Sequence, residues 1–117
     1  MVTAEIAVAL PALVLVTALA MWGITAASVQ LACTDAARSG ARAAARGEAI
    51  PAVRAMVTRA LPAGAAVDVR RDAHTSHVEI SVPVGPPGGA ELLPLVVGAQ
   101  ATALTEPGAA EGAHRPP

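Results

Sequence analysis

Glu5 is the side chain best placed for chemistry, because it opens a long apolar segment. After it, the next charged residue along the chain is Asp35. A carboxylate at the edge of such a segment has two interpretations. One is an interfacial acid stabilised by the partial positive charge at a helix N-terminus. The other is a functional acid that requires a positive partner, because ionisable groups within membranes usually pair. The residue alone leaves both open.

A thiol and two imidazoles are the remaining candidates. Cys33 is the single cysteine, which excludes an intramolecular disulfide and a cysteine-based zinc site. We expect it to be a small apolar filler, with an intermolecular disulfide as the alternative. His74 and His77 lie near Asp72 in an expected turn. Metal sites usually need three or four convergent ligands, so we expect exposed turn residues and no bound metal.

The sequence contains no catalytic constellation. Thr75, Ser76 and Ser81 lie close to His77 only along the chain, and nothing indicates a nucleophile held by a base and an orienting group. No glycine-rich phosphate loop follows a strand. We therefore expect no enzymatic activity and no cofactor.

Composition excludes several other classes. The 117 residues carry a net charge of −1, with eight arginines and no lysine, whereas nucleic-acid binders usually show a basic excess. Trp22 is the single aromatic residue, so there is no platform for stacking bases. Apolar residues make up 54% of the chain, too many for a disordered protein, but 30 of the residues are alanine, which buries little area. These totals favour a membrane-associated or assembly-dependent protein.

Residues 1–30 are predicted to form a transmembrane helix. The stretch from Ile6 to Val29 is almost wholly apolar, and about 20 such residues span a bilayer. Pro11 would kink this helix without ending it. A cleaved signal peptide is the alternative, with Ala18-Leu19-Ala20 as a cleavage signal, but the basic n-region is missing and the apolar run is long.

Residues 31–48 are predicted to continue the helix out of the membrane. Small residues recur every four positions and would let neighbouring helices approach closely; they are Ser28, Ala32, Ala36, Gly40 and Ala44. Arg38, Arg42 and Arg46 form a second row at the same spacing. We interpret this row as a solvated helix face, with anionic lipid or an acidic partner as the alternative.

Residues 49–106 are predicted to form a small head of the α+β class. Pro51 fits the first turn of a helix whose apolar spacing runs to Leu61. Valine and isoleucine then alternate with polar residues on either side of a turn over 72–76, which indicates an antiparallel hairpin. A helical turn is expected within 90–97, interrupted by Pro94, and a third strand over 98–105. The predicted fold is thus a long N-terminal helix followed by a small antiparallel sheet of two or three strands. Residues 107–117 are expected to be a disordered tail.

The N-terminal residues resemble a known family. The stretch from Met1 to Pro11, with its Thr3-Ala4-Glu5 step and a proline one and a half turns later, looks like the mature N-terminus of type IV pilin-like proteins. It is most similar to the TadE-like minor pilins and pseudopilins of the tight-adherence (Tad/Flp) pilus system. The segment from Cys33 to Glu48 is similar to the one that follows the anchor in members from high-GC Gram-positive bacteria. The similarity is firm over residues 1–48 and loose over 49–106.

This resemblance implies a structural role in pilus assembly. A prepilin peptidase would remove a short basic leader, leaving glutamate as the fifth mature residue, which is the position of Glu5. The glutamate would neutralise the N-terminal amine of a neighbouring subunit, and pairing removes much of the cost of two charges in an apolar bundle. The implied partners are other pilin or Tad-system membrane proteins, the peptidase and membrane lipid. The implied location is the cell membrane, with a single span and an extracytoplasmic head, or a surface pilus.

Two features oppose that implication. No leader precedes Met1, and the arginines after the span favour a cytoplasmic C-terminal side. A basic leader ending in glycine, encoded upstream in the same frame, would resolve both. Without one, a membrane-tethered binding or regulatory protein is the first alternative. A small secreted domain released by signal peptidase is the second.

Overall fold

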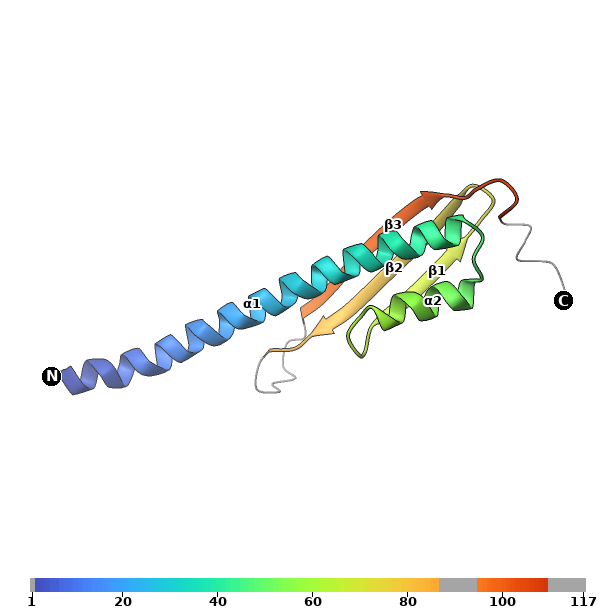
Figure 1. Ribbon diagram of the computed structural model, residues 1–117. Coiled ribbons are helices and arrows are strands. Elements are labelled where there is room, and N and C mark those ends of the chain that lie inside the picture. The colour runs from blue at the N-terminus through green and yellow to red at the C-terminus, as the bar shows by residue number, and fades with distance from the viewer. Residues whose placement is uncertain (1, 87–94, 110–117) are drawn as a thin grey trace.

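One helix, α1 (Val2–Ala45), runs through most of the length of the molecule (Figure 1). The computed structural model describes residues 2–86 and 95–109. Within them α1 is followed by α2 (Ile50–Arg59) and by three strands, β1 (Ala66–Arg71), β2 (Thr75–Val84) and β3 (Leu95–Leu104). The molecule is 78 Å long and 22 by 17 Å across, because the first half of α1 extends beyond the rest. The predicted α+β class, with a long apolar N-terminal helix and an antiparallel sheet, is confirmed.

Helix α1 is continuous across residue 30, where the sequence suggested a boundary between a span and an extension. Alanine is the strongest helix former, and Pro11 lies inside the helix without ending it. The helix ends at Gly47, whose φ of 91° is a conformation that glycine adopts at little cost. There the amides of Gly47 and Glu48 donate to the carbonyls of Ala44 and Ala43, which is the Schellman arrangement of a helix C-terminus.

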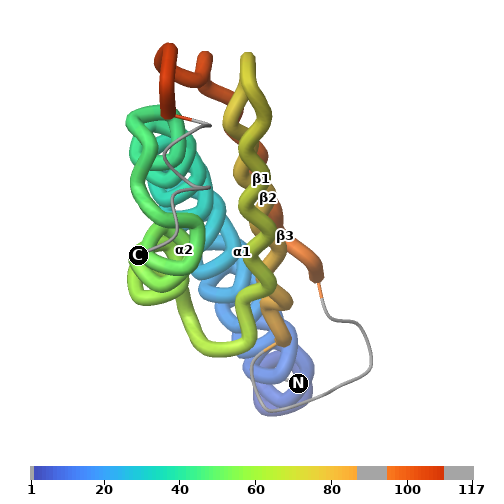
Figure 2. Tube along the Cα trace, turned by 90° about the vertical axis from the view of Figure 1, so that its right-hand side faces the viewer, coloured from blue at the N-terminus to red at the C-terminus, as the bar shows by residue number. Residues whose placement is uncertain are grey.

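The sheet is an antiparallel meander in the order β1-β2-β3. Helices α1 and α2 lie together on one of its faces (Figure 2). Val78 is paired with Val69 on one side and with Ala101 on the other, so every second residue of each strand faces the helices. Pro51 lies in the first turn of α2, as predicted, and this helix ends at Arg59, two residues before Leu61.

The boundaries of β2 and β3 differ from the prediction. The turn between β1 and β2 is shorter, because Thr75 and Ser76 already belong to β2. Strand β3 starts at Leu95 instead of residue 98, so the helical turn expected within 90–97 is wrong over 95–97, and 90–94 lie outside the described residues. Val84 and Val82 provide cross-strand partners for Leu95 and Val97, and this pairing extends the strand.

The described part of the chain extends to Ala109, past residue 107, where the tail was expected to start. The amide of Glu106 donates to the carbonyl of Ala45 at 2.9 Å, and Ala109 is buried beside Gly47. This segment therefore covers the C-terminal end of α1, and only residues 110–117 of the predicted tail lie outside the described part.

The core of the head consists of small and β-branched side chains. Valines and one isoleucine from α2 and the sheet pack on alanines of α1, together with Cys33; the largest are Val53, Val57, Val78, Ile80 and Val82. Ser76 and Thr105 place a hydroxyl–hydroxyl hydrogen bond of 2.9 Å at one end of this core. Because the second half of α1 supplies one wall, the head includes residues 33–45 and does not begin at residue 49.

Candidate functional site: the exposed half of helix α1

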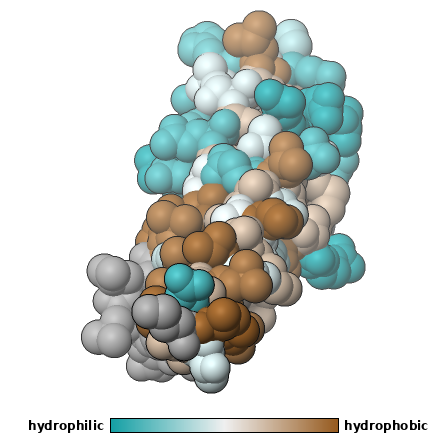
Figure 3. Space-filling view, turned by 90° about the vertical axis from the view of Figure 1, so that its left-hand side faces the viewer, coloured by the Kyte–Doolittle hydropathy of each residue, from teal (hydrophilic) through white to brown (hydrophobic). Residues whose placement is uncertain are grey.

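The first half of α1 has no partner within the described residues. No side chain from residue 2 to 17 is buried or half-buried, and the large apolar ones among them are each more than half exposed. Seen from the side where the N-terminus lies, the molecule shows apolar side chains mainly in the middle and lower parts of the view (Figure 3). Most hydrophilic side chains lie in its upper part. We refer to Val2–Met21 as the exposed half of α1. It lies within the one described helix that is long and apolar enough to cross a membrane.

Glu5 lies in the first turn of this exposed half. Its carboxylate is solvent-exposed and is near the partial positive charge of the helix N-terminus. No ion pair or side-chain hydrogen bond of Glu5 occurs within residues 2–86 and 95–109. Within these residues the carboxylate is therefore free to pair with a positive group from elsewhere.

Along α1, the first side-chain hydrogen bond to the head is made by Trp22. Its indole Nε1 donates to the carbonyl oxygen of Val84 at 3.4 Å, at the end of β2. Two turns further on, Gln30 Nε2 donates to the carbonyl oxygen of Gly98 in β3 at 2.8 Å. The free part of the helix is consequently shorter than the predicted 1–30 span, since residues 22–30 already lie beside the sheet.

The row of small residues, which the sequence analysis expected to let neighbouring helices approach closely, packs inside the head. Ala36, Gly40 and Ala44 are buried, and Ala32 is half-buried. A Cβ atom on Gly40 would lie 2.6 Å from Val57 Cγ2 of α2. The small row does let a helix approach closely, but that helix is α2 of the same chain.

The arginine row is exposed, as expected for a solvated face. Arg46 forms a 3.0 Å ion pair with Glu48, and both side chains are about half exposed, so the pair adds little stability. At 1.5 Å per residue, Arg38 lies about 24 Å beyond Trp22 along the axis. This distance exceeds the screening length of about 8 Å at physiological salt. If lipid headgroups lay at the level of Trp22, they would therefore interact only weakly with Arg38.

Cys33 is completely buried, with 0% of its surface exposed. Burial raises the pKa of the thiol, because the thiolate loses hydration. The side chain is a core filler in this fold, and an intermolecular disulfide through it would require the head to open.

Asp72 organises the turn between β1 and β2. Its carboxylate accepts hydrogen bonds from the amides of His74 and Thr75 and from the Thr75 hydroxyl. His77 lies on the other face of β2 from the core, with Nδ1 2.9 Å from Thr102 Oγ1. No group of three or more histidine, cysteine or acidic side chains converges anywhere in the described part of the chain. These residues therefore fit a hydrogen-bonded turn.

The Asp72 turn gives the head a pH dependence. The amide of Thr75, then that of His74, lowers the pKa of the Asp72 carboxyl. The stability that these hydrogen bonds contribute to the head is thus present above the ordinary aspartate pKa of about 3.9. It is lost as the pH falls through the lower pKa of Asp72 in the folded state. We expect the difference in unfolding midpoint between the wild type and Asp72→Asn to shrink between pH 7 and pH 3 in denaturant titrations. An equal difference at both pH values would contradict this role.

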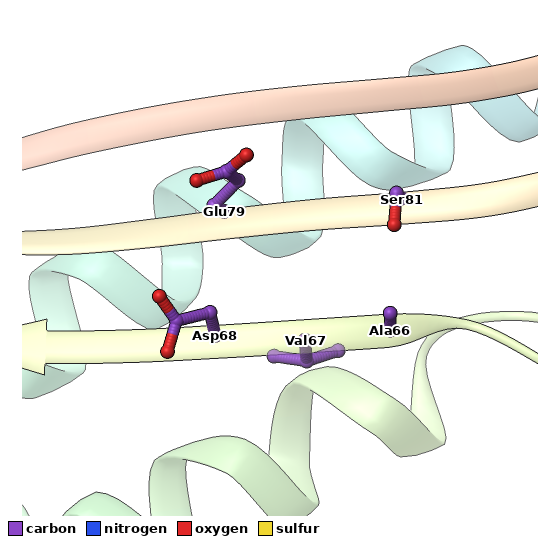
Figure 4. Close-up of a pocket in the computed structure, with 5 residues that line it drawn as sticks. All are labelled: Ala66, Val67, Asp68, Glu79 and Ser81. Carbon is purple, nitrogen blue, oxygen red and sulfur yellow. The ribbon is translucent and has the colours of Figure 1, made fainter.

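Two further arrangements were not indicated by the sequence. Arg71 Nη2 donates to the carbonyl of Glu48 and ties β1 to the loop after α1, while Nε and Nη1 are buried without a partner in the described residues. In the sequence, Arg71 follows Val67 and Val69 at a spacing of two residues, which places it on the same, apolar face of the strand. This spacing was the signal that could have indicated its burial. On the opposite face Asp68 is paired in register with Glu79 beside a shallow depression that Ser81 also lines (Figure 4).

The depression beside Asp68 has the character of an ordinary solvated surface. Like charges that face each other across strands are unfavourable, and Arg70 Nε, 2.7 Å from Asp68 Oδ2, offsets part of this repulsion. The two carboxylates have no third acidic or histidine ligand nearby in the described ranges. The exposed half of α1 remains the feature with the strongest functional signal.

Comparison with known proteins identifies a relative. No family model and no solved structure matches the chain. The protein named Apoptosis inhibitor Rv3655c, from Mycobacterium tuberculosis (strain ATCC 25618 / H37Rv), is 40% identical over 115 residues, which cover 97% of this chain and 84% of the relative. The chain belongs to the family of Rv3655c. The similarity extends over both the helix and the head.

Proposed function

We propose that this protein is a structural subunit of a pilus-type assembly, of the TadE-like minor pilin or pseudopilin kind in a Tad/Flp system. The observation that carries the proposal is the exposed half of α1, a free apolar helix that starts with a single carboxylate and continues rigidly into a folded head. Lipid can cover such a helix in a membrane. Outside the membrane the helix needs other helices, because exposed apolar surface of this extent is unfavourable in water.

Glu5 would select and orient the neighbouring subunit. Its carboxylate is unpaired in the described chain and would lie among apolar helices after assembly. The partner that the resemblance to pilin-like proteins implies is the N-terminal amine of another subunit. Pairing within the bundle would then fix the axial position of each helix, since displacement would leave two charges unpaired in an apolar setting.

The proposed location is the cell membrane, with one span and an extracytoplasmic head. The arginines after the span favour a cytoplasmic C-terminal side, which opposes this location. The hydrogen bond of Trp22 to the head weakens that objection, because it places the end of the free helix well before the arginines. Arg38 lies sixteen residues after Trp22, at the margin of the roughly 15–20 residues within which basic side chains influence orientation. A prepilin peptidase is a partner if a leader is encoded upstream.

Photo-crosslinking in cells tests the proposed role. A photoreactive amino acid replaces Leu13 in the exposed half of α1, and a second variant carries it at Gln100 on the outer face of the sheet. We expect crosslinks to pilin-like or Tad-system membrane proteins from position 13 and few from position 100. Crosslinks from position 13 to lipid alone, in cells that assemble pili, would favour the membrane-tethered alternative.

A second candidate function is inhibition of apoptosis, the activity in the name of the relative. The similarity over 97% of the chain favours it. Its test is survival of host cells that receive the wild-type chain or Glu5→Ala after an apoptotic stimulus. Equal protection by both would attribute that activity to something other than Glu5-dependent assembly, and no protection by either would exclude it.

A further inference from the structure

The length of the exposed half of α1 matches the thickness of a membrane. From Val2 to Trp22 the helix rises about 30 Å, which is close to the thickness of a bilayer hydrocarbon core. Trp22 also makes the first side-chain hydrogen bond from α1 to the head, to the carbonyl of Val84. A helix that spans the bilayer with these residues therefore leaves no stalk between lipid and head.

Apolar side chains are exposed at the end of the head that faces the N-terminus of α1. Val84 ends β2 there and is paired with Leu95, which starts β3 (Figure 1). Leu95 is 49% exposed and Val96 is 64% exposed. We refer to Trp22, Val84, Leu95 and Val96 as the near end of the head.

Charged side chains are absent from the near end within the described residues. None occurs in α1 between Trp22 and Asp35, in β2 after Glu79, or anywhere in β3. In Figure 3, most hydrophilic side chains gather in the upper part of the view, and apolar ones cover its middle and lower parts. Tryptophan favours the headgroup level of membranes, because its ring is apolar and its N–H group is polar.

We propose that the near end of the head lies in the headgroup layer of the membrane, where Leu95 and Val96 contact lipid and Trp22 marks the boundary. The lipid contact continues directly from the exposed half of α1, so a single surface includes both the span and the base of the head. The proposal rests on the membrane anchoring in the proposed function but not on its pilus role. The head is then held at one height by contacts at two separate points of its base.

Tryptophan fluorescence measures this depth directly, because Trp22 is the single tryptophan of the chain. The full chain is reconstituted into phosphatidylcholine vesicles whose acyl chains carry bromine near the glycerol end or near the methyl end. We expect quenching to be roughly twofold stronger for bromine near the glycerol end, as for an interfacial tryptophan. Stronger quenching from the methyl end, or equal and negligible quenching from both, would overturn the proposal.

A matched pair of labelled positions tests the contact of the head with lipid. Val96 and Leu104 lie on the same face of β3 at opposite ends, and Leu104 is the more exposed, at 82%. Each is replaced with cysteine and labelled with a fluorophore, while Cys33 stays in place because its buried thiol does not react. Bromolipid should quench the label at 96 and not at 104.

The remaining outcomes separate this proposal from others. Equal solvent exposure of both labels would show that the head stands away from the membrane. A label at 96 that is shielded from water and unaffected by bromolipid would indicate that a second copy covers this end, which also overturns the lipid contact. Neither measurement involves a pilus, so failure of the assembly role leaves these results unchanged.

Discussion

Glu5→Ala is expected to leave the protein in the membrane and to abolish its incorporation into a pilus. The exposed half of α1 keeps all its large apolar side chains in this variant, so insertion should proceed as in the wild type. What is lost is the one carboxylate that can pair with a positive group of a neighbour. That group would then be left unpaired in an apolar bundle, at a cost of about 3–5 kcal/mol for a broken buried ion pair. Such a loss lowers the population of the correct contact by roughly two to four orders of magnitude.

The measurement is a comparison of two fractions, membranes and sheared surface material, by immunodetection of the head. Glu5→Asp keeps the charge on a shorter side chain and should retain part of the assembly, whereas Glu5→Gln keeps the shape and should fail like alanine. All three variants change the same residue. The membrane fraction of each variant shows whether its insertion is altered. Assembly of Glu5→Gln at the wild-type level would show that the charge is not needed and would favour the interfacial-acid interpretation.

Helical and strand periods were readable from the sequence because they depend on neighbouring residues. The apolar run to Val29, the glycine at position 47 and the alternation from Val78 to Val84 each act within a few positions, and α1, its end and β2 follow from them. Strand β3 was harder to delimit, because its first residues are a continuous apolar run that gives no period. Pairing with Val84 and Val82 decides where it begins.

In the candidate site too, neighbouring residues indicate some features, and only contacts between distant residues determine the others. Glu5 was evident because a charge interrupts an otherwise apolar segment. The contact of Trp22 with the head was not evident, since it depends on a hydrogen bond to Val84, 62 residues away. The small row from Ala36 to Ala44 was recognised as a surface for close approach, but local spacing cannot tell a helix of the same chain from that of a neighbour.

Gly40→Leu is expected to destabilise the head while leaving α1 helical. A Cβ atom at position 40 would lie 2.6 Å from Val57 Cγ2 and 3.3 Å from Val78 Cγ2, so even the first added carbon requires α2 or β2 to move. Overpacking of a tight core costs about 1–3 kcal/mol and occasionally more, and leucine adds three further carbons at this point. The gain of about 1 kcal/mol from replacing glycine within a helix offsets only part of that cost. Small domains have stabilities near the lower end of about 5–15 kcal/mol, so this loss is a large share of the total.

Gly23→Leu is the matched control, since it makes the same chemical change in the same helix where no atom lies within 4 Å of the added Cβ. Cys33 reports on both variants, because its thiol is inaccessible until the head opens. A net loss of about 2 kcal/mol predicts labelling of this thiol roughly 30-fold faster in Gly40→Leu, and Gly23→Leu should match the wild type. Equal labelling in the two variants would mean that α2 can move away from α1 at little cost. In that case the core would not depend on the small row, and Ala36, Gly40 and Ala44 would again be available for contacts with other subunits.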